Sequence, residues 1–119
     1  MPSAEPRVPR VPLPAQVFHI LLSLAPREAH GYGIIVDVER ATEGSIRLGP
    51  GTLYGALKRL VADGLVEESA RRPSPADDER RRYYRLTAAG RRLLGAEASR
   101  LTKAVGAARR AGVLKPGTA

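Results

Sequence analysis

Apolar side chains recur three and four residues apart in three segments of the first half of the chain, which predicts three amphipathic helices. The first helix covers residues 14–24. The second begins at Gly31 and stops at Gly44, and the third begins with Pro50 in its first position and stops at Gly64. We expect their buried faces to be formed by Val17, Ile20, Leu21 and Leu24, by Ile34, Ile35 and Val38, and by Leu53, Leu57, Leu60 and Val61.

Short segments of alternating apolar and polar residues predict the β structure. Residues 45–48 read as a stub strand between the second and third helices. Residues 65–72 and 81–87 predict two further strands, and residues 73–79 between them contain prolines and acids that exclude a central strand. The two strands therefore form a hairpin with a long polar tip.

A last apolar pattern predicts a helix over residues 88–112, with Thr87 as its N-cap. The chain is thus mainly α with a small β-hairpin, in the order helix, helix, stub strand, helix, strand, strand, helix. This is the plan of a winged helix-turn-helix, whose third helix lies in the major groove and whose hairpin wing contacts the DNA backbone. We expect a flexible, basic, proline-rich arm (1–12), a DNA-binding domain (13–87), a C-terminal dimerisation helix (88–112) and a tail (113–119).

The charge of the chain supports a polyanionic partner. Its formal net charge is +8, with 20 Lys and Arg against 12 Asp and Glu, and such a balance attracts nucleic acid or an anionic membrane surface. The chain contains no apolar run long enough to span a bilayer, and prolines interrupt any signal-peptide pattern near its start. We therefore expect a cytoplasmic protein.

The sequence offers no catalytic or metal-binding pattern. The chain has no cysteine, so a thiolate metal site is excluded. His19 and His30 lie far apart, without the carboxylates or cysteines that would complete a ligand set. No serine, histidine and acid stand in a recognised catalytic order. We expect no cofactor, no metal and no enzymatic activity.

Four ungapped stretches resemble the PadR family of transcriptional regulators: HGYGI (30–34), LGPGTLYGALKRL (48–60), DGLVEE (63–68) and RRRYYRLTAAGRRLL (80–94). The resemblance implies the winged-helix fold, a dimer, repressor activity and a response to small aromatic ligands. Two positions depart from the family pattern. Gly49 replaces the usual serine before the third helix, and Gly55 replaces the usual proline within it. Gly55 either leaves room for a base edge or loosens the helix.

The candidate DNA contacts lie on the third helix and on the wing. On the third helix they are Thr52, Tyr54, Gly55, Lys58 and Arg59, and on the wing Arg72, Arg80, Arg81 and Arg82. Cations at these positions suit phosphates and the acceptors of guanine. The alternatives are a solvated helix face, and wing arginines that serve solubility or pair with Asp77, Asp78 and Glu79.

The last helix carries a longer apolar stripe than one small domain needs. The candidate dimer interface is Leu94, Ala98, Leu101, Val105 and Ala108. The alternative is that the helix packs back onto its own domain, as we expect for Leu93, and the two roles could use opposite faces. A two-fold dimer would suit a palindromic operator.

The sequence as a whole predicts a sequence-specific, ligand-responsive repressor that binds double-stranded DNA as a homodimer. Two alternatives stay open. One is a nucleic-acid-binding protein without sequence preference, and the other is a protein-interaction module on the same fold.

Overall fold

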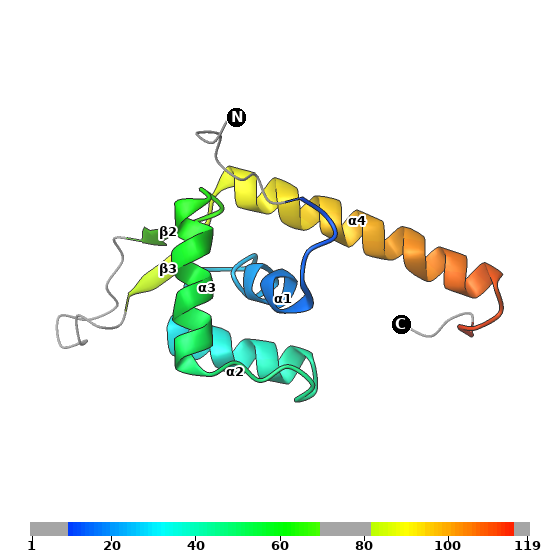
Figure 1. Ribbon diagram of the computed structural model, residues 1–119, viewed down its shortest axis with the longest axis horizontal. Coiled ribbons are helices and arrows are strands. Elements are labelled where there is room, and N and C mark those ends of the chain that lie inside the picture. The colour runs from blue at the N-terminus through cyan, green and yellow to red at the C-terminus, as the bar shows by residue number, and fades with distance from the viewer. Residues whose placement is uncertain (1–9, 70–81, 116–119) are drawn as a thin grey trace, which may run out of the picture.

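The computed structural model describes residues 10–69 and 82–115. These residues form four helices and three short strands (Figure 1). In chain order they are α1 (Ala15–Ser23), β1 (Ala29–His30), α2 (Gly31–Ala41), α3 (Pro50–Ala62), β2 (Val66–Ser69), β3 (Tyr83–Leu86) and α4 (Ala88–Arg110).

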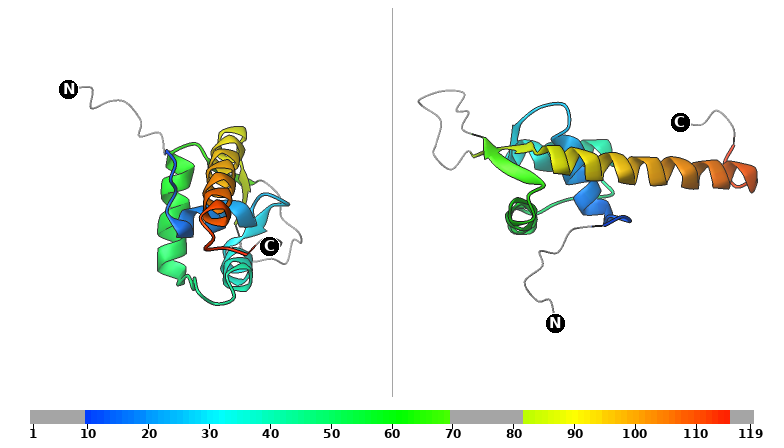
Figure 2. Two further views of the ribbon diagram at one scale, coloured as in Figure 1. Left: turned by 90° about the vertical axis from the view of Figure 1, so that its right-hand side faces the viewer. Right: turned by 90° about the horizontal axis from the view of Figure 1, so that it is seen from above.

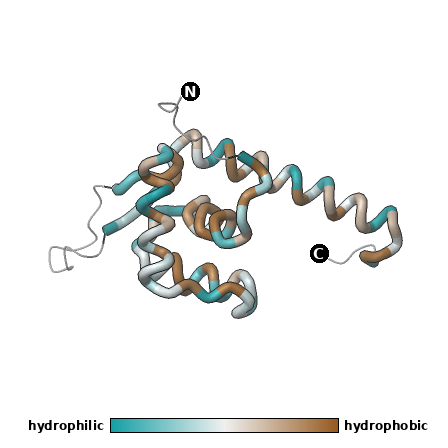
Figure 3. Tube along the Cα trace, in the orientation of Figure 1, coloured by the Kyte–Doolittle hydropathy of each residue, from teal (hydrophilic) through white to brown (hydrophobic). Residues whose placement is uncertain are grey.

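The core lies between the helices, with α1 at its centre. Helix α1 contacts α2 and α4 and is seen end-on between them and α3 in Figure 1. Its residues Ile20 and Leu21 are fully buried, as are Ile34 on α2 and Leu53 on α3. Removing each such side chain from water contributes about 1.5–3 kcal/mol, so the apolar stripes seen as brown segments in Figure 3 hold the helices together.

The three strands form an antiparallel sheet in the order β1-β3-β2. Val66 of β2 pairs with Leu86 of β3, and Ala29 of β1 pairs with Tyr84 on the other edge of β3. The predicted hairpin is therefore present, and a strand preceding α2 completes the sheet. Tyr84 is buried in the core.

The predicted stub strand at residues 45–48 is wrong, because this segment is a loop. The hydroxyl of Thr42 accepts a hydrogen bond from the Ile46 N–H at 3.1 Å and donates to the Val38 carbonyl at 2.8 Å. Leu48 is buried and Ile46 packs against the core. Their alternation therefore reflects a loop covered on one side, while β1 occupies the sheet edge that a stub strand would need.

The start of α4 is fastened to the end of α3. The Thr87 hydroxyl accepts from the Gly90 N–H at 3.0 Å, and so caps α4 as predicted, and it donates to the Gly64 carbonyl at 2.6 Å. The Thr87 N–H donates to the Leu65 carbonyl at 3.1 Å. Gly90 then lies directly against that carbonyl, with no room for a Cβ atom.

Only the first half of α4 is packed onto the rest of the chain. Gly90, Leu94 and Glu97 are its buried residues, and beyond them the helix extends away from the other elements (Figures 1 and 2). Leu94 is 6% exposed and belongs to the core of its own chain. Little of its side chain is therefore left for a partner, and its predicted place in a dimer interface stays a prediction.

We predict that Gly90→Ala destabilises the protein by about 1–3 kcal/mol, because the new methyl group would overlap the Leu65 backbone and force a shift. The matched control is Gly95→Ala, on the same helix with open space around it. This control should stabilise by about 0.5–1 kcal/mol, the usual gain over glycine within a helix. Urea denaturation measures both, and equal effects would contradict the close approach at Gly90.

Candidate nucleic-acid interface

Helix α3 has a buried back and an exposed front. Leu53, Ala56, Leu57 and Leu60 are buried, whereas four of the predicted contact residues are exposed: Thr52, Tyr54, Lys58 and Arg59. Val61, which the spacing placed on the buried face, is 39% exposed, and Ala56 takes its place in the core. The difference arises because α3 is covered on one side only, which leaves the edge of its apolar stripe in solvent.

The predicted contact Gly55 is half-buried on the front of α3. A Cβ atom built there would lie 3.8 Å from the nearest atom, the terminal Nη1 of Arg59. The fold itself therefore does not require glycine at this position. Helix α3 starts at Pro50 without any side-chain cap, since Gly49 offers none.

The ring of Tyr54 packs directly against Gly31, the first residue of α2. A Cβ atom on Gly31 would overlap the Tyr54 hydroxyl and ring, so glycine at position 31 is what allows this contact. His30 holds the same helix end, because its Nδ1 accepts a hydrogen bond from the Gly33 N–H at 3.1 Å. His30 is thus an N-cap residue, a role that its place just before the helical pattern could have indicated.

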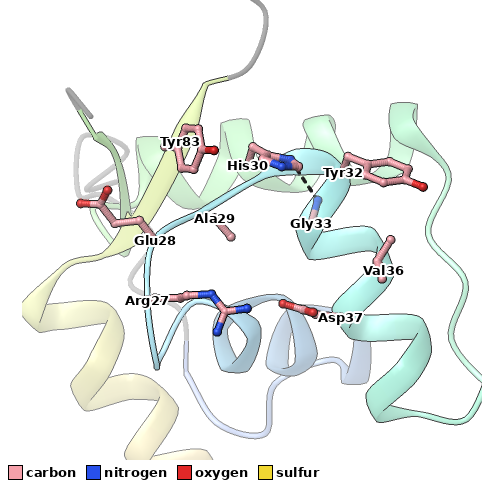
Figure 4. Close-up of a pocket in the computed structure, with 9 residues that line it drawn as sticks. All are labelled: Arg27, Glu28, Ala29, His30, Tyr32, Gly33, Val36, Asp37 and Tyr83. Carbon is pink, nitrogen blue, oxygen red and sulfur yellow. Dashed lines mark hydrogen bonds between the residues drawn. The ribbon is translucent and has the colours of Figure 1, made fainter. Parts of the chain in front are cut away.

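Ring contacts join this helix end to the wing, as Figure 4 shows. The His30 ring meets the Tyr83 ring edge-on, with centroids 5.4 Å apart, and lies parallel to Tyr32 at 6.4 Å. Tyr83 is on β3, so the first turn of α2 and the base of the wing are packed against each other. The rings border a hollow of about 350 Å³ that Arg27 and Asp37 also line.

The arginines of the wing that the structure describes are paired with glutamates of strands and loops. Arg82 Nη1 lies 3.0 Å from Glu68 Oε1, and Arg85 Nε lies 2.9 Å from Glu67 Oε1. Arg85 also approaches Glu28 at 3.6 Å. These partners were missed by sequence reasoning, although Glu67 stands directly opposite Arg85 in the strand register. Exposed pairs of this kind contribute about 0–1 kcal/mol, so Arg82 can exchange its partner at little cost.

The other predicted wing contacts, Arg72, Arg80 and Arg81, lie outside the described residues. So do the acids that were considered as their partners, Asp77, Asp78 and Glu79. Of the four predicted wing contacts, the structure therefore describes Arg82, which is exposed and lies just before β3.

Helix α3 and the wing share one surface. Between them lies a hollow of about 360 Å³, lined by Tyr54, Leu57, Lys58, Val61, Glu68, Arg82 and Tyr84. Lys58 and Arg82 thus line the same hollow from α3 and the wing. Burial, and after it the nearby Glu68 carboxylate, raises the pKa of Tyr84, so this hydroxyl stays neutral beside the two cations.

The described residues place no metal site beside this surface. Within residues 10–69 and 82–115, no three His, Cys, Asp or Glu side chains are grouped so that they could hold a metal ion. Of the four helices, including the long α4, none has the length and apolar run that crossing a membrane would require.

Comparison with known proteins identifies the class of this winged-helix protein. Residues 20–96 match the model of the transcriptional regulator PadR-like family. The chain therefore belongs to the PadR-like family, as its motifs indicated, and this is a family of transcriptional regulators and not of enzymes.

The chain is also similar to individual proteins, one of which is named as a transcriptional regulator. The chain is 42% identical over 76 residues to the transcriptional regulator Rv3488 of Mycobacterium tuberculosis, covering 64% of this chain and 65% of that protein. It is 41% identical over 88 residues to an uncharacterised 37.1 kDa protein in transposon TN4556 of Streptomyces fradiae, covering 73% of this chain and 23% of that one. The chain thus spans about a quarter of one relative and just under two thirds of the other.

A solved structure shows the same fold. Bacillus subtilis PadR, in a crystal structure with operator DNA, superposes with a TM-score of 0.59 at 21% identity, covering 71% of this chain and 46% of that one. The predicted fold class, a mainly helical winged helix-turn-helix with a small antiparallel sheet, is confirmed.

We predict that Gly31→Ala destabilises the protein by about 1–3 kcal/mol, because the Tyr54 ring must move to make room for the methyl group. In a Tyr54→Ala background the same change should cost far less. The double-mutant cycle, measured by thermal denaturation, then gives a coupling energy of about 0.5–3 kcal/mol. Gly33→Ala is the control, since its Cβ atom would lie 3.6 Å from His30, an ordinary contact. A cycle without coupling would contradict the contact.

Proposed function

We propose that this protein is a sequence-specific, double-stranded DNA-binding repressor that works as a homodimer in the cytoplasm. One observation carries the proposal: the exposed front of α3 and the wing residue Arg82 form a single cationic surface around one hollow. Bacillus subtilis PadR, which shares the fold, is found in complex with operator DNA. The net charge of +8 supports a polyanionic partner.

The two parts of this surface have different tasks in the proposal. Lys58 and Arg59 project from the front of α3, where their side chains reach guanine O6 and N7 or neighbouring phosphates. Arg82 leaves Glu68 for a phosphate of the backbone, which fixes the position of the protein without selecting a sequence. The exchange is inexpensive because the pair is exposed and already screened by water.

The dimer in this proposal forms through the second half of α4. Its apolar stripe continues the face that Gly90, Leu94 and Glu97 bury against the chain itself. The continuation consists of Leu101 and Ala108, both half-buried, and of Ala98 and Val105, both exposed. One face is thus divided along its length between the chain and a second copy, rather than two opposite faces serving the two roles.

Repression and its release follow from the geometry of such a dimer. Two α3 helices must enter successive major grooves one turn apart on the same side of the duplex. A small aromatic effector that changes the angle between the two α4 helices would move the α3 helices away from this spacing. Both half-sites could then no longer be bound together, and the operator would be released.

We predict that Lys58→Ala combined with Arg59→Ala lowers affinity for the selected operator, and that the specificity over unrelated DNA falls with it. Each lost base contact should cost about 1–3 kcal/mol. The operator is obtained by sequencing the DNA fragments that the purified protein enriches from a random pool. Competition with unrelated DNA then measures the ratio of the affinity for the operator to the affinity for unrelated DNA. Equal competition by any DNA would support the rival reading of a binder without sequence preference, and unchanged regulation in cells would support a protein-interaction module.

Arg82→Ala should weaken binding to all sequences alike and reduce the slope of log affinity against log salt by about 1. Arg92→Ala is its control, because Arg92 is also exposed but lies on α4. A selective loss on one DNA sequence would contradict the backbone role of Arg82.

We predict that Leu101→Glu produces monomers in sedimentation, because it places a charge in the proposed seam. Lys103→Glu is the matched control, since Lys103 is exposed and lies on the other side of the helix. The control should stay dimeric. Equal sedimentation of the wild type and Leu101→Glu would remove the α4 dimer from the proposal.

A further inference from the structure

Glu97 is the one charged residue that is buried within the described ranges, with 2% of its surface exposed. It lies on the face of α4 that packs against its own chain, and it is not one of the residues assigned to DNA binding or to the dimer seam. Arg100 holds its carboxylate with two parallel hydrogen bonds, from Nε to Oε1 at 2.8 Å and from Nη2 to Oε2 at 2.7 Å. Such paired bonds fix direction as well as distance.

The same carboxylate reaches a second segment of the chain. The Leu13 backbone also donates a hydrogen bond to it, and the Leu13 side chain is buried in the core just before α1. The Arg100 hydrogen bonds, and after them the Leu13 bond, hold the pKa of Glu97 below its ordinary value. Glu97 therefore stays ionised and ties α4 to the segment that leads into α1.

Because of the position of Glu97 along α4, a small change of angle there would move the far end of the helix by several ångströms. Glu97 is the last buried residue of the helix, and the part that follows carries the proposed dimer seam. From Glu97 to the end of the helix at Arg110 the length is about 20 Å. A tilt of about 10° at Glu97 would displace the far end by about 3.5 Å over that length, close to the rise of about 3.4 Å per base along one strand.

Burial alone would not prevent such a tilt. Apolar contacts are not directional, so a helix held only by leucines can pivot with little loss of buried area. The bonds of Glu97 to Leu13 and Arg100 are directional, and they stand at the point where α4 leaves the body of its chain.

We infer that Glu97, oriented by Arg100 and bonded to Leu13, is a positioning residue that sets the angle of α4 and thereby the half-site spacing that the dimer accepts. This inference rests on the proposed function, because it assumes a dimer that reads two half-sites. It assigns to Glu97 no contact with DNA. Its effect reaches the DNA only through the distance between the two α3 helices.

The experiment compares the affinity of the full-length protein for operators whose half-sites are separated by the best spacing or by one base pair more or fewer. The main variant is Glu97→Leu combined with Arg100→Met. Replacing both partners of a buried ion pair by apolar residues is often neutral for stability, so we expect a folded dimer. Its preference for the best spacing should fall at least about fivefold, the lower range of measured coupling between sites.

Two further variants separate positioning from stability. Glu97→Gln keeps an oxygen that accepts from Leu13 but loses one of the two Arg100 bonds, and it should retain more of the spacing preference than the double variant. Arg100→Lys keeps the charge but cannot form the two-pronged bond, and it should broaden the preference in a protein that folds. Lys103→Met, a change at an exposed position of the same helix outside the Glu97–Arg100 pair, should leave the preference unchanged.

The possible results separate a failure of the role assigned to Glu97 from a failure of the proposed function. A folded, dimeric double variant with the wild-type spacing preference overturns the inference. If the double variant does not fold, an unchanged preference in Arg100→Lys overturns it instead. A wild-type protein that binds every spacing and sequence alike would instead contradict the proposed function, and the inference with it.

Discussion

The arrangement of the molecule depends on the contact between Thr87, Gly90 and the turn after α3. Thr87 forms hydrogen bonds with Gly64 and Leu65 just after α3, caps α4 and follows the last strand of the wing. Gly90 then allows α4 to touch the Leu65 carbonyl. One small junction thus joins α3, the wing and α4. Because backbone groups form most of it, little rearrangement is possible without breaking hydrogen bonds.

The charges of the protein fall into two kinds, with different physical consequences. On the surface that α3 and the wing share, ion pairs such as Arg82 with Glu68 are exposed, and water and salt screen them. They can be exchanged for phosphates. On α4, the pair of Glu97 with Arg100 has its carboxylate buried, and breaking one side would leave an unsatisfied charge away from water. Exposed pairs therefore suit binding, whereas the buried pair suits a fixed geometry.

Sequence reasoning reached the helices because each has one buried face, and such a face repeats at helical spacing. It failed where the apolar pattern did not correspond to the secondary structure or to the burial. Ile46 and Leu48 alternate as in a strand, yet the Thr42 hydroxyl accepts from the Ile46 N–H and the segment is a loop. Val61 has the spacing of a core residue but lies at the uncovered edge of α3. Leu94 was assigned to the dimer interface because the apolar stripe of α4 is continuous, and the sequence does not show where packing onto its own domain ends.

The sequence by itself determined the class of fold, the family and the cationic front of α3, since periodicity, turn residues and motifs are properties of short stretches. Tertiary structure alone decided that β1 pairs with the second edge of β3, that wing arginines meet Glu67 and Glu68, and that Gly31 makes room for Tyr54. It also decided that Glu97 is buried beside Leu13. These features join residues far apart along the chain, and which distant groups meet depends on how all the helices pack together.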